Sequence, residues 1–159
     1  MSNAYQREEL GNYNSTVCFK AVVTGMEDVL GAQATAIALR SAGRKRGVEL
    51  ALSLGLSKGS GSINDLAGLA TKLNDAVGLN GTRLCAVDKI DVDGDVIRVY
   101  TRETVCSAGE PMGSKRVCTF TLGAIHGAVE HLLNVNLTPK HTGSVLRGDT
   151  HDVFELTPR

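Results

Sequence analysis

The sequence contains no tryptophan, few aromatic residues and no net charge. Aromatic residues make up 4% of the 159 residues, and 17 basic side chains are balanced by 17 acidic ones. A chain with neither a cationic excess nor many aromatic platforms lacks the usual means of attracting and stacking nucleic acid. We therefore expect no nucleic-acid partner and no general attraction to anionic lipid.

Long apolar runs are also missing. No stretch approaches the roughly 18–20 apolar residues that a membrane span needs. The polar segment up to Asn14 has no apolar core of a secretory signal. The sequence therefore predicts a cytoplasmic protein with no membrane span. A composition of 42% hydrophobic and 21% charged residues is typical of one globular domain.

Cysteine and histidine occur without a metal-binding spacing. Cys18, Cys85, Cys106 and Cys118 include no C-x-x-C pair, and the four histidines form no H-E-x-x-H motif. This pattern favours small buried thiols, with Cys106 in a predicted loop as the candidate redox-sensitive thiol. We predict no metal and no cofactor. A catalytic Cys–His pair that forms only in the folded chain stays open.

Hydrophobic periodicity predicts four helices and four strands in one α/β domain of the α+β type. Helical spacing follows the N-cap candidates 14–16 as far as Gly31 and continues over 33–54, 66–77 and 115–133. Residues 83–91, 95–104, 136–144 and 152–157 have strand composition. Between the first two strands, Asp93-Gly94 indicates a hairpin with a type I′ turn. We expect the order α-α-α-β-β-α-β-β, with a flexible segment over 1–13 and a single domain over 14–159.

Two of the helices are rich in small residues. Gly43 and Gly47 interrupt the second helix, although glycine costs about 1 kcal/mol relative to alanine inside a helix. Gly123 and Gly127 recur one turn apart in the last helix. Such positions indicate the close approach of another backbone or of a ligand.

Three other patterns fail as functional motifs. Residues 91–95 resemble a calcium loop, but the glycine comes two places early and the bidentate glutamate is missing. Residues 109–115 lack the glycine–lysine spacing of a phosphate loop. The basic cluster over 40–46 is either a solvated helix face or a site for a carboxylate.

Three stretches, taken in order, carry a family resemblance. Residues 41–50 contain A-G-x-x-x-G-x-x-L, residues 118–130 read C-x-F-x-x-G-x-x-x-G-A-x-E, and residues 141–149 lead into 152–156. Over about residues 16–157 they resemble the vinyl-4-reductase-type, or hydrocarbon-binding, domain and its relatives among the small TRAPP vesicle-tethering subunits. The resemblance implies helices packed on a twisted antiparallel sheet and dimerisation through helices. It also implies binding of a small apolar ligand rather than catalysis.

The last hairpin departs from the family pattern E-T-x-C-x-x-x-G-D-x-x-C. His141 stands at the glutamate position, and Ser144 and Asp152 replace the two cysteines. The departure is expected to remove a thiolate metal site or redox pair from this hairpin. Some TRAPP relatives carry an acylated cysteine after the second helix, but residues 57–62 contain no cysteine here. We therefore expect no covalent acylation in this loop.

The sequence thus favours a homodimeric, non-catalytic module that binds or senses a small apolar or aromatic molecule. The predicted ligand-binding residues are Phe19, Val22, Met26, Arg44, Gly47, Leu50, Leu54, Phe120, Ile125, His126 and His141, with the arginine and the histidines as polar anchors. The alternative is a homo-oligomeric scaffold of TRAPP-like fold without a ligand. A third hypothesis, an accessory protein of tetrapyrrole metabolism, is preferred to an enzyme because the sequence has no dinucleotide fingerprint.

Overall fold

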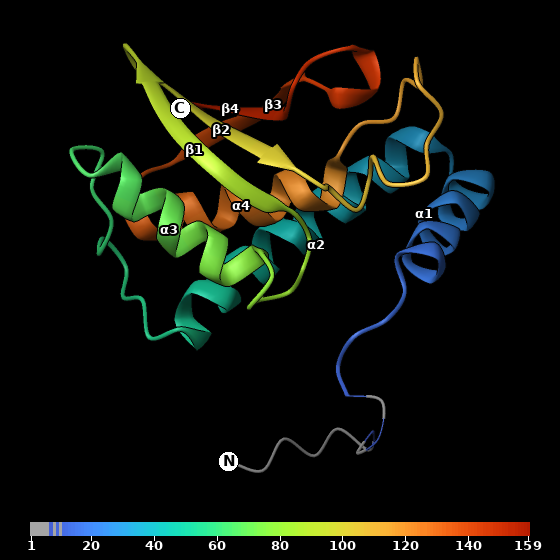
Figure 1. Ribbon diagram of the computed structural model, residues 1–159, viewed down its shortest axis with the longest axis horizontal. Helices are drawn as coiled ribbons and strands as arrows, with labels where there is room; N and C mark the ends of the chain where they lie inside the picture. Colours follow the sequence, from blue (N-terminus) through green and yellow to red (C-terminus); the bar gives the residue numbers. More distant parts are fainter. Residues whose placement is uncertain (1–6, 8, 10) are drawn as a thin grey trace.

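A computed structural model describes residues 7, 9 and 11–159. The predicted order of helices and strands is confirmed (Figure 1). The elements are α1 (Thr16–Leu30), α2 (Ala32–Ser53), α3 (Leu66–Val77), β1 (Ala86–Asp93), β2 (Val96–Arg102), α4 (Thr119–Leu133), β3 (Leu137–Gly143), the short 3-10 helix η1 (Val145–Arg147) and β4 (Asp152–Pro158). Much of the segment predicted to be flexible, residues 1–6, 8 and 10, lies outside the described residues.

The strands form one antiparallel sheet in the order β1-β2-β4-β3. Figure 1 shows α3 and α4 against one face of this sheet, α2 beyond α4, and α1 to the side. This is the α+β fold class that the sequence predicts. None of the helices in the described part of the chain is long and apolar enough to cross a membrane.

The β1–β2 hairpin has a different turn from the predicted one. Asp93 pairs with Val96, so the loop residues are Gly94 and Asp95. Gly94 has a φ of 58°, whereas Asp95 does not have positive φ. A type I′ turn needs positive φ at both loop residues, so the type I′ prediction is wrong, and the φ pattern is that of type II′.

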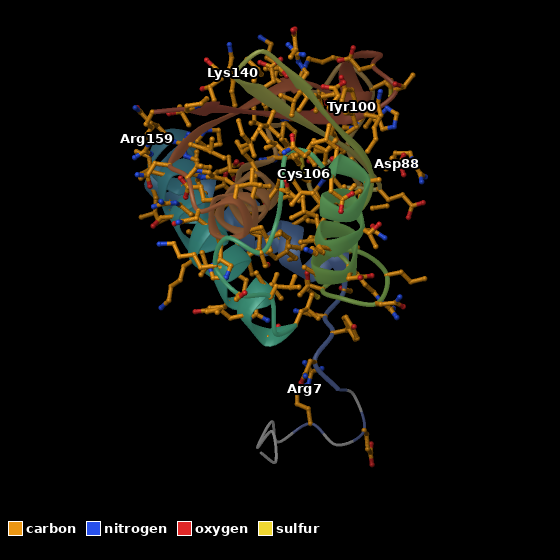
Figure 2. The ribbon with its side chains drawn as sticks, turned by 90° about the vertical axis from the view of Figure 1, so that its left-hand side faces the viewer. Arg7, Asp88, Tyr100, Cys106, Lys140 and Arg159 are labelled. Carbon is orange, nitrogen blue, oxygen red and sulfur yellow. A yellow bond between two sulfur atoms is a disulfide. The ribbon has the colours of Figure 1, made fainter. Side chains whose placement is uncertain are left out.

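The sheet has one buried face and one polar face. Along β2, Ile97, Val99 and Thr101 are buried, while the alternating residues point away from the helices. On the polar face Arg98 forms ion pairs with Glu155 and Asp93. Figure 2 shows Tyr100 and Asp88 on the same side of the molecule, and His151 contacts both of them.

Both edge strands are irregular. Bulges lie between Val87 and Lys89 in β1 and between His141 and Gly143 in β3. Strand β3 also contains Pro139, which has no backbone N–H to donate. Bulges, proline and charged side chains make an edge strand a poor template for further pairing.

Helices α2 and α4 are in close backbone contact along a line of four glycines, the glycine seam. A Cβ atom on Gly43 or Gly47 of α2 would come within 3.0 Å of carbonyl oxygens of α4. The same is true of Gly123 and Gly127 of α4 against the backbone of α2. Of the two explanations that the sequence offers for the small residues, close approach of another backbone is confirmed here. The glycines leave no cavity for a ligand between these helices.

The core lies between the sheet and the helical layer. Its fully buried side chains include Leu73 of α3, Ile125 of α4, Val99 of β2 and Phe154 of β4. The predicted apolar stripe of the last helix is buried, as expected, but the helix begins at Thr119 rather than at 115. Residues 114–118 have no regular secondary structure, and the Arg116 amide donates a hydrogen bond to the Ser114 hydroxyl in place of a helical one.

Ion pairs attach α1 to the rest of the molecule. Lys20 contacts Glu110 at 2.7 Å, and Arg116 bridges Glu110 and Glu27. Lys20 also donates to the carbonyl oxygens of Cys106 and Ala108. Helix α1 is therefore fixed to the loop between β2 and α4 mainly by charged groups.

Candidate functional site

A buried polar cluster lies where four segments meet at one end of the sheet. Asp152 is the first residue of β4 and pairs with Thr101 of β2. His141 comes from β3 next to the bulge, and Cys118 is the N-cap of α4. Thr104 belongs to the loop that follows β2. The antiparallel register of β3 and β4, with His141 opposite Phe154, places the histidine beside the start of β4.

Asp152 is the best-connected member of the cluster. Its Oδ2 atom accepts hydrogen bonds from the hydroxyl groups of Thr104 at 2.5 Å and Ser107 at 2.8 Å. Burial alone would raise the pKa of this carboxyl, but the nearby imidazole of His141 and the two hydroxyl groups lower the pKa to about 2. The cluster therefore holds a carboxylate rather than a carboxylic acid.

His141 faces this carboxylate without forming a hydrogen bond to it. The amide N–H of Cys118 donates to Nδ1 at 3.3 Å, so in a neutral ring the proton is on Nε2. Nε2 lies 3.4 Å from Asp152 Oδ1, and the two side chains are 1% and 0% exposed. Neither Nε2 nor Oδ1 has a hydrogen-bond partner among the residues that the structure describes. Two orphaned polar atoms of opposite character thus face each other in the interior.

The sulfur of Cys118 completes a set of metal-ligating atoms. Cys118, His141 and Asp152 each offer one ligand atom, and the three atoms lie within 4.8 Å of one another. Thiolate, imidazole and carboxylate are the donors that Zn²⁺ takes in proteins. The orphaned Nε2 and Oδ1 atoms are what a bound cation would satisfy, so this donor set fits a zinc-type ion when Cys118 is a thiolate.

The source of this sulfur atom bears on the expectation about the last hairpin. The hairpin itself has no thiolate, as the sequence shows. Cys118 lies outside the hairpin, before α4, and brings a sulfur atom to His141 and Asp152. The expectation concerned the hairpin alone, and it stays a prediction there, because the sulfur beside His141 and Asp152 comes from another segment. Cys118 and His141 are also neighbours in space, but the Cys118 sulfur is bonded to Cys106, so they do not form the catalytic Cys–His pair that the sequence left open.

Cys118 is joined to Cys106 by a disulfide. Figure 2 shows Cys106 where the sheet meets the helical layer. The prediction of small buried thiols is therefore wrong for these two cysteines, and Cys18 is an exposed thiol. It holds for Cys85, where burial, reinforced by the charge of Asp152, raises the pKa of the thiol to about 12. Cys106, the predicted redox-sensitive residue, is half-buried.

A second buried polar group connects α2, α4 and β3. Glu130 accepts hydrogen bonds from the amide of Leu137 and from Arg44, both at 2.7 Å. His126 Nε2 lies 2.9 Å from the Leu137 carbonyl oxygen and 3.0 Å from Glu130. Two acceptors at one nitrogen place the imidazole proton on Nε2. Arg44 of the basic cluster thus binds a carboxylate of its own chain.

The predicted ligand-binding residues do not form one site. Phe19 and Phe120 pack edge to face with their ring centroids 5.7 Å apart, and Met26 is half-buried. Val22 and Leu54 are exposed, so they do not act as cavity walls in this chain. The remaining positions are divided between the core (Leu50, Ile125), the helical seam (Gly47), the Glu130 group (Arg44, His126) and the Cys118 cluster (His141).

An apolar groove occurs at the opposite end of the sheet. It has a volume of about 400 Å³ and lies between the β1–β2 turn, the end of α4 and the segment before α3. Its apolar lining consists of Ile63, Val92, Ile97, Leu133, Val135, Leu137 and Pro158. Ser62 and Asp95 add a hydroxyl and a carboxylate at its margin. Sequence reasoning missed this groove because its residues come from four separate segments of the chain.

Solved structures share this fold. The phenol-responsive sensory domain of the transcription activator PoxR, determined with phenol, superposes with a TM-score of 0.65 and 16% identity, covering 91% of this chain and 75% of that one. Subunit 3 of a trafficking protein particle complex from Naegleria fowleri, covalently bound to palmitic acid, gives a TM-score of 0.62 and 18% identity, covering 91% and 92%. No protein-family model matches the chain, and no curated protein matches it.

The two structures confirm the fold that the family resemblance implied. One is a sensory domain and the other a TRAPP subunit, the two groups to which the sequence motifs are similar. At these identities the likeness establishes the architecture. Function must be argued from this chain's own residues.

Proposed function

We propose that this protein is the ligand-binding module of a sensor, a homodimer without catalytic activity of its own that holds a small apolar or aromatic molecule. The observation that carries the proposal is the groove of about 400 Å³ beside Ile63 and Val135. Mostly apolar walls with a few polar groups are the usual composition of a small-molecule site. The Asp95 carboxylate or the Ser62 hydroxyl would accept a hydrogen bond from the hydroxyl group of a phenol-like ligand.

The Cys118 cluster supports a role without catalysis. A cysteine nucleophile needs an accessible thiolate and a base within reach. Here the Cys118 sulfur is in a disulfide and fully buried, and His141 Nδ1 accepts from the Cys118 amide instead of its sulfur. The PoxR domain, whose structure contains phenol, gives a precedent for ligand sensing in this fold.

Helix α1 supports the homodimer. It has no buried residue, and Val17, Val22, Val29 and Leu30 are exposed. A second copy that packs its α1 against this helix would bury these side chains and gain about 25 cal/mol per Å² of apolar area. The same observation favours the second candidate function, a scaffold of TRAPP-like fold that assembles through its helices and binds no small molecule.

Native mass spectrometry of freshly purified protein, followed by denaturing extraction, separates the two candidates. A dimer with a defined additional mass supports the sensor, and an apolar or tetrapyrrole mass identifies the ligand class. An empty dimer that also fails to bind phenol or toluene supports the scaffold. A monomer at micromolar concentration contradicts the homodimer in both.

Binding at the groove is tested by titrating phenol while backbone amide shifts are recorded by NMR. The shifts should concentrate in residues 61–63 and 92–97. Ile63→Asp introduces a charge at an exposed position of the groove and should weaken binding at least about tenfold, or 1.4 kcal/mol. Leu79→Asp, at a similarly exposed position after α3, is the matched control and should leave binding unchanged. Equal binding by both variants would place the ligand elsewhere.

A further inference from the structure

We propose that the Cys106–Cys118 pair is a redox gate on the cluster formed by Cys118, His141 and Asp152. As two thiolates the pair gives the cluster four ligands for a zinc-type cation. As a disulfide it excludes the cation. This inference does not depend on the apolar groove or on the ligand proposed for it.

The count of ligand atoms is the first argument. Structural zinc sites are almost always four-coordinate and tetrahedral. The cluster supplies three ligand atoms, and the sulfur of Cys106 is bonded directly to one of them. Reduction of the disulfide therefore gives two sulfur ligands, one imidazole nitrogen and one carboxylate oxygen. No other residue has to move into the cluster.

The electronic state of sulfur is the second argument. A metal ligand of this type is the thiolate, and the sulfur atoms of a disulfide carry no such charge. In the oxidised chain the remaining donors are His141 Nε2 and Asp152 Oδ1, which face each other at 3.4 Å without hydrogen-bond partners in the described part of the chain. Two ligands are too few to retain zinc against water. These two unpartnered atoms are two of the four ligands of the proposed site, and the disulfide keeps the other two from binding a cation.

The backbone keeps Cys106 near Cys118 in both states. The amide of Val105 donates to the Leu84 carbonyl oxygen at 3.0 Å. The amide of Ser107 donates to the Thr104 carbonyl oxygen at 3.1 Å. Lys20 binds the Cys106 carbonyl oxygen from α1. None of these bonds involves sulfur, so breaking the disulfide leaves the loop in place and the two thiols adjacent.

The difference in accessibility determines which of the two cysteines reacts first with an external thiol or disulfide. Cys118 is fully buried, whereas Cys106 is half-buried and within reach of a small thiol. During oxidation the Cys106 thiolate attacks glutathione disulfide and releases one glutathione thiolate. The Cys118 thiolate then attacks the Cys106 sulfur and releases the second. Two protein thiols lose two electrons and two protons, and one glutathione disulfide becomes two glutathione molecules.

The test compares the same full-length chain in two redox states after removal of metal with EDTA. One sample is reduced with tris(2-carboxyethyl)phosphine and the other is oxidised with glutathione disulfide, and mass spectrometry after alkylation counts the thiols. Zn²⁺ affinity is measured by competition with a chromophoric chelator. We expect one equivalent to bind the reduced chain, with an affinity at least about 100-fold weaker in the oxidised chain. Bound Zn²⁺ should also protect Cys106 and Cys118 from iodoacetamide, while exposed Cys18 reacts.

Two variants sharpen this comparison. Cys106→Ser cannot form the disulfide and keeps three ligands, so its weaker Zn²⁺ binding should no longer respond to glutathione disulfide. Cys18→Ser, which changes an exposed thiol on α1, is the matched control and should keep the full redox response. Equal Zn²⁺ affinity of the oxidised and reduced wild-type chains would overturn the proposal, as would a folded reduced chain that binds no Zn²⁺. If Cys106→Ser does not fold, the wild-type comparison still decides.

Discussion

Helices α1 and α4 have the same length of 15 residues but opposite environments. Twelve residues of α4 are buried, whereas α1 has none. Both sequences place apolar side chains at helical spacing, so periodicity does not distinguish them. Helix α4 contacts the sheet on one side and α2 on the other, whereas α1 borders α2 and a loop. Apolar spacing thus predicts which face of a helix is apolar, and it does not say whether the same chain covers that face.

The glycine seam is what allows α4 to be enclosed. With Gly123 and Gly127 facing Gly43 and Gly47, the backbones of α2 and α4 touch and the larger side chains of α4 are left for the sheet. Helix α1 also contains a glycine, Gly25, but no atom would lie within 4 Å of a Cβ there. A glycine-to-alanine substitution can therefore be compared at a crowded position and at an open one.

The largest effect is expected from alanine at these glycines. Gly47→Ala places a Cβ against the α4 backbone and should lower the free energy of unfolding by about 1–3 kcal/mol or more. Gly25→Ala, its matched control, should raise it by up to about 1 kcal/mol because alanine is the better helix former. Urea denaturation measures both. A stabilising Gly47→Ala would contradict a close approach of the two backbones at this position.

An intermediate effect on stability is expected when the pH is lowered, because His126 belongs to the buried polar group that connects α4 to β3. Burial lowers the pKa of His126 below its usual value, opposed by the facing Glu130 and the Leu137 carbonyl oxygen. The second proton would go onto Nδ1, which is buried without an acceptor among the described residues. Because the unfolded chain binds this proton more readily, the stability present above about pH 6.5 is lost as pH falls below it. Urea unfolding at about pH 7.5 and about pH 5.5 measures the loss.

The control for this titration is His126→Gln, whose amide can still donate to the Leu137 carbonyl oxygen. The variant should show a flatter dependence of stability between these two pH values. Below about pH 4.5 both proteins should lose stability further, because the Leu137 amide and Arg44 hold the pKa of Glu130 below its usual value despite burial. A pH slope that is unchanged in His126→Gln would assign the effect to other groups.

The smallest effect on the stability of a single chain is expected on α1. Val29→Lys changes a side chain that is 82% exposed in the last turn of the helix, where a cation is favourable. Unfolding of the monomer should change by less than about 0.5 kcal/mol. The proposed dimer, in contrast, should dissociate at least about tenfold more readily in light scattering. Leu79→Lys is the control, and equal dissociation of both variants would exclude α1 from the interface.

Local signals predicted most of the fold. Ser15 caps α1 through its hydroxyl group, and α3 spans the predicted residues 66–77. The start of α4 was missed because the segment at Ser114 and Arg116 has no breaker residue that marks a helix boundary. The turn type was missed because Asp93-Gly94 suits the predicted turn only if the strands pair one residue out of the observed register.

The candidate sites were largely beyond sequence reasoning. His141 was named as an anchor, yet its partners come from a different strand and from the N-cap of α4. The one available signal was the replacement of cysteines by Ser144 and Asp152, because aspartate is itself a metal ligand. The apolar groove has no such signal. Its walls are ordinary apolar residues, and their meeting depends on how the β1–β2 hairpin lies against the end of α4.

The irregular edge strands limit the ways in which copies of this protein could associate. With no net charge, the molecules have no overall repulsion to keep them apart. The bulges of β1 and β3, with Pro139 and the nearby charges of Lys140 and Lys89, close the route by which sheets of neighbouring molecules would join into fibres. Growth along the sheet is thus blocked at both margins. The helical side stays open for the homodimer proposed above, and a symmetric contact there would end at two chains.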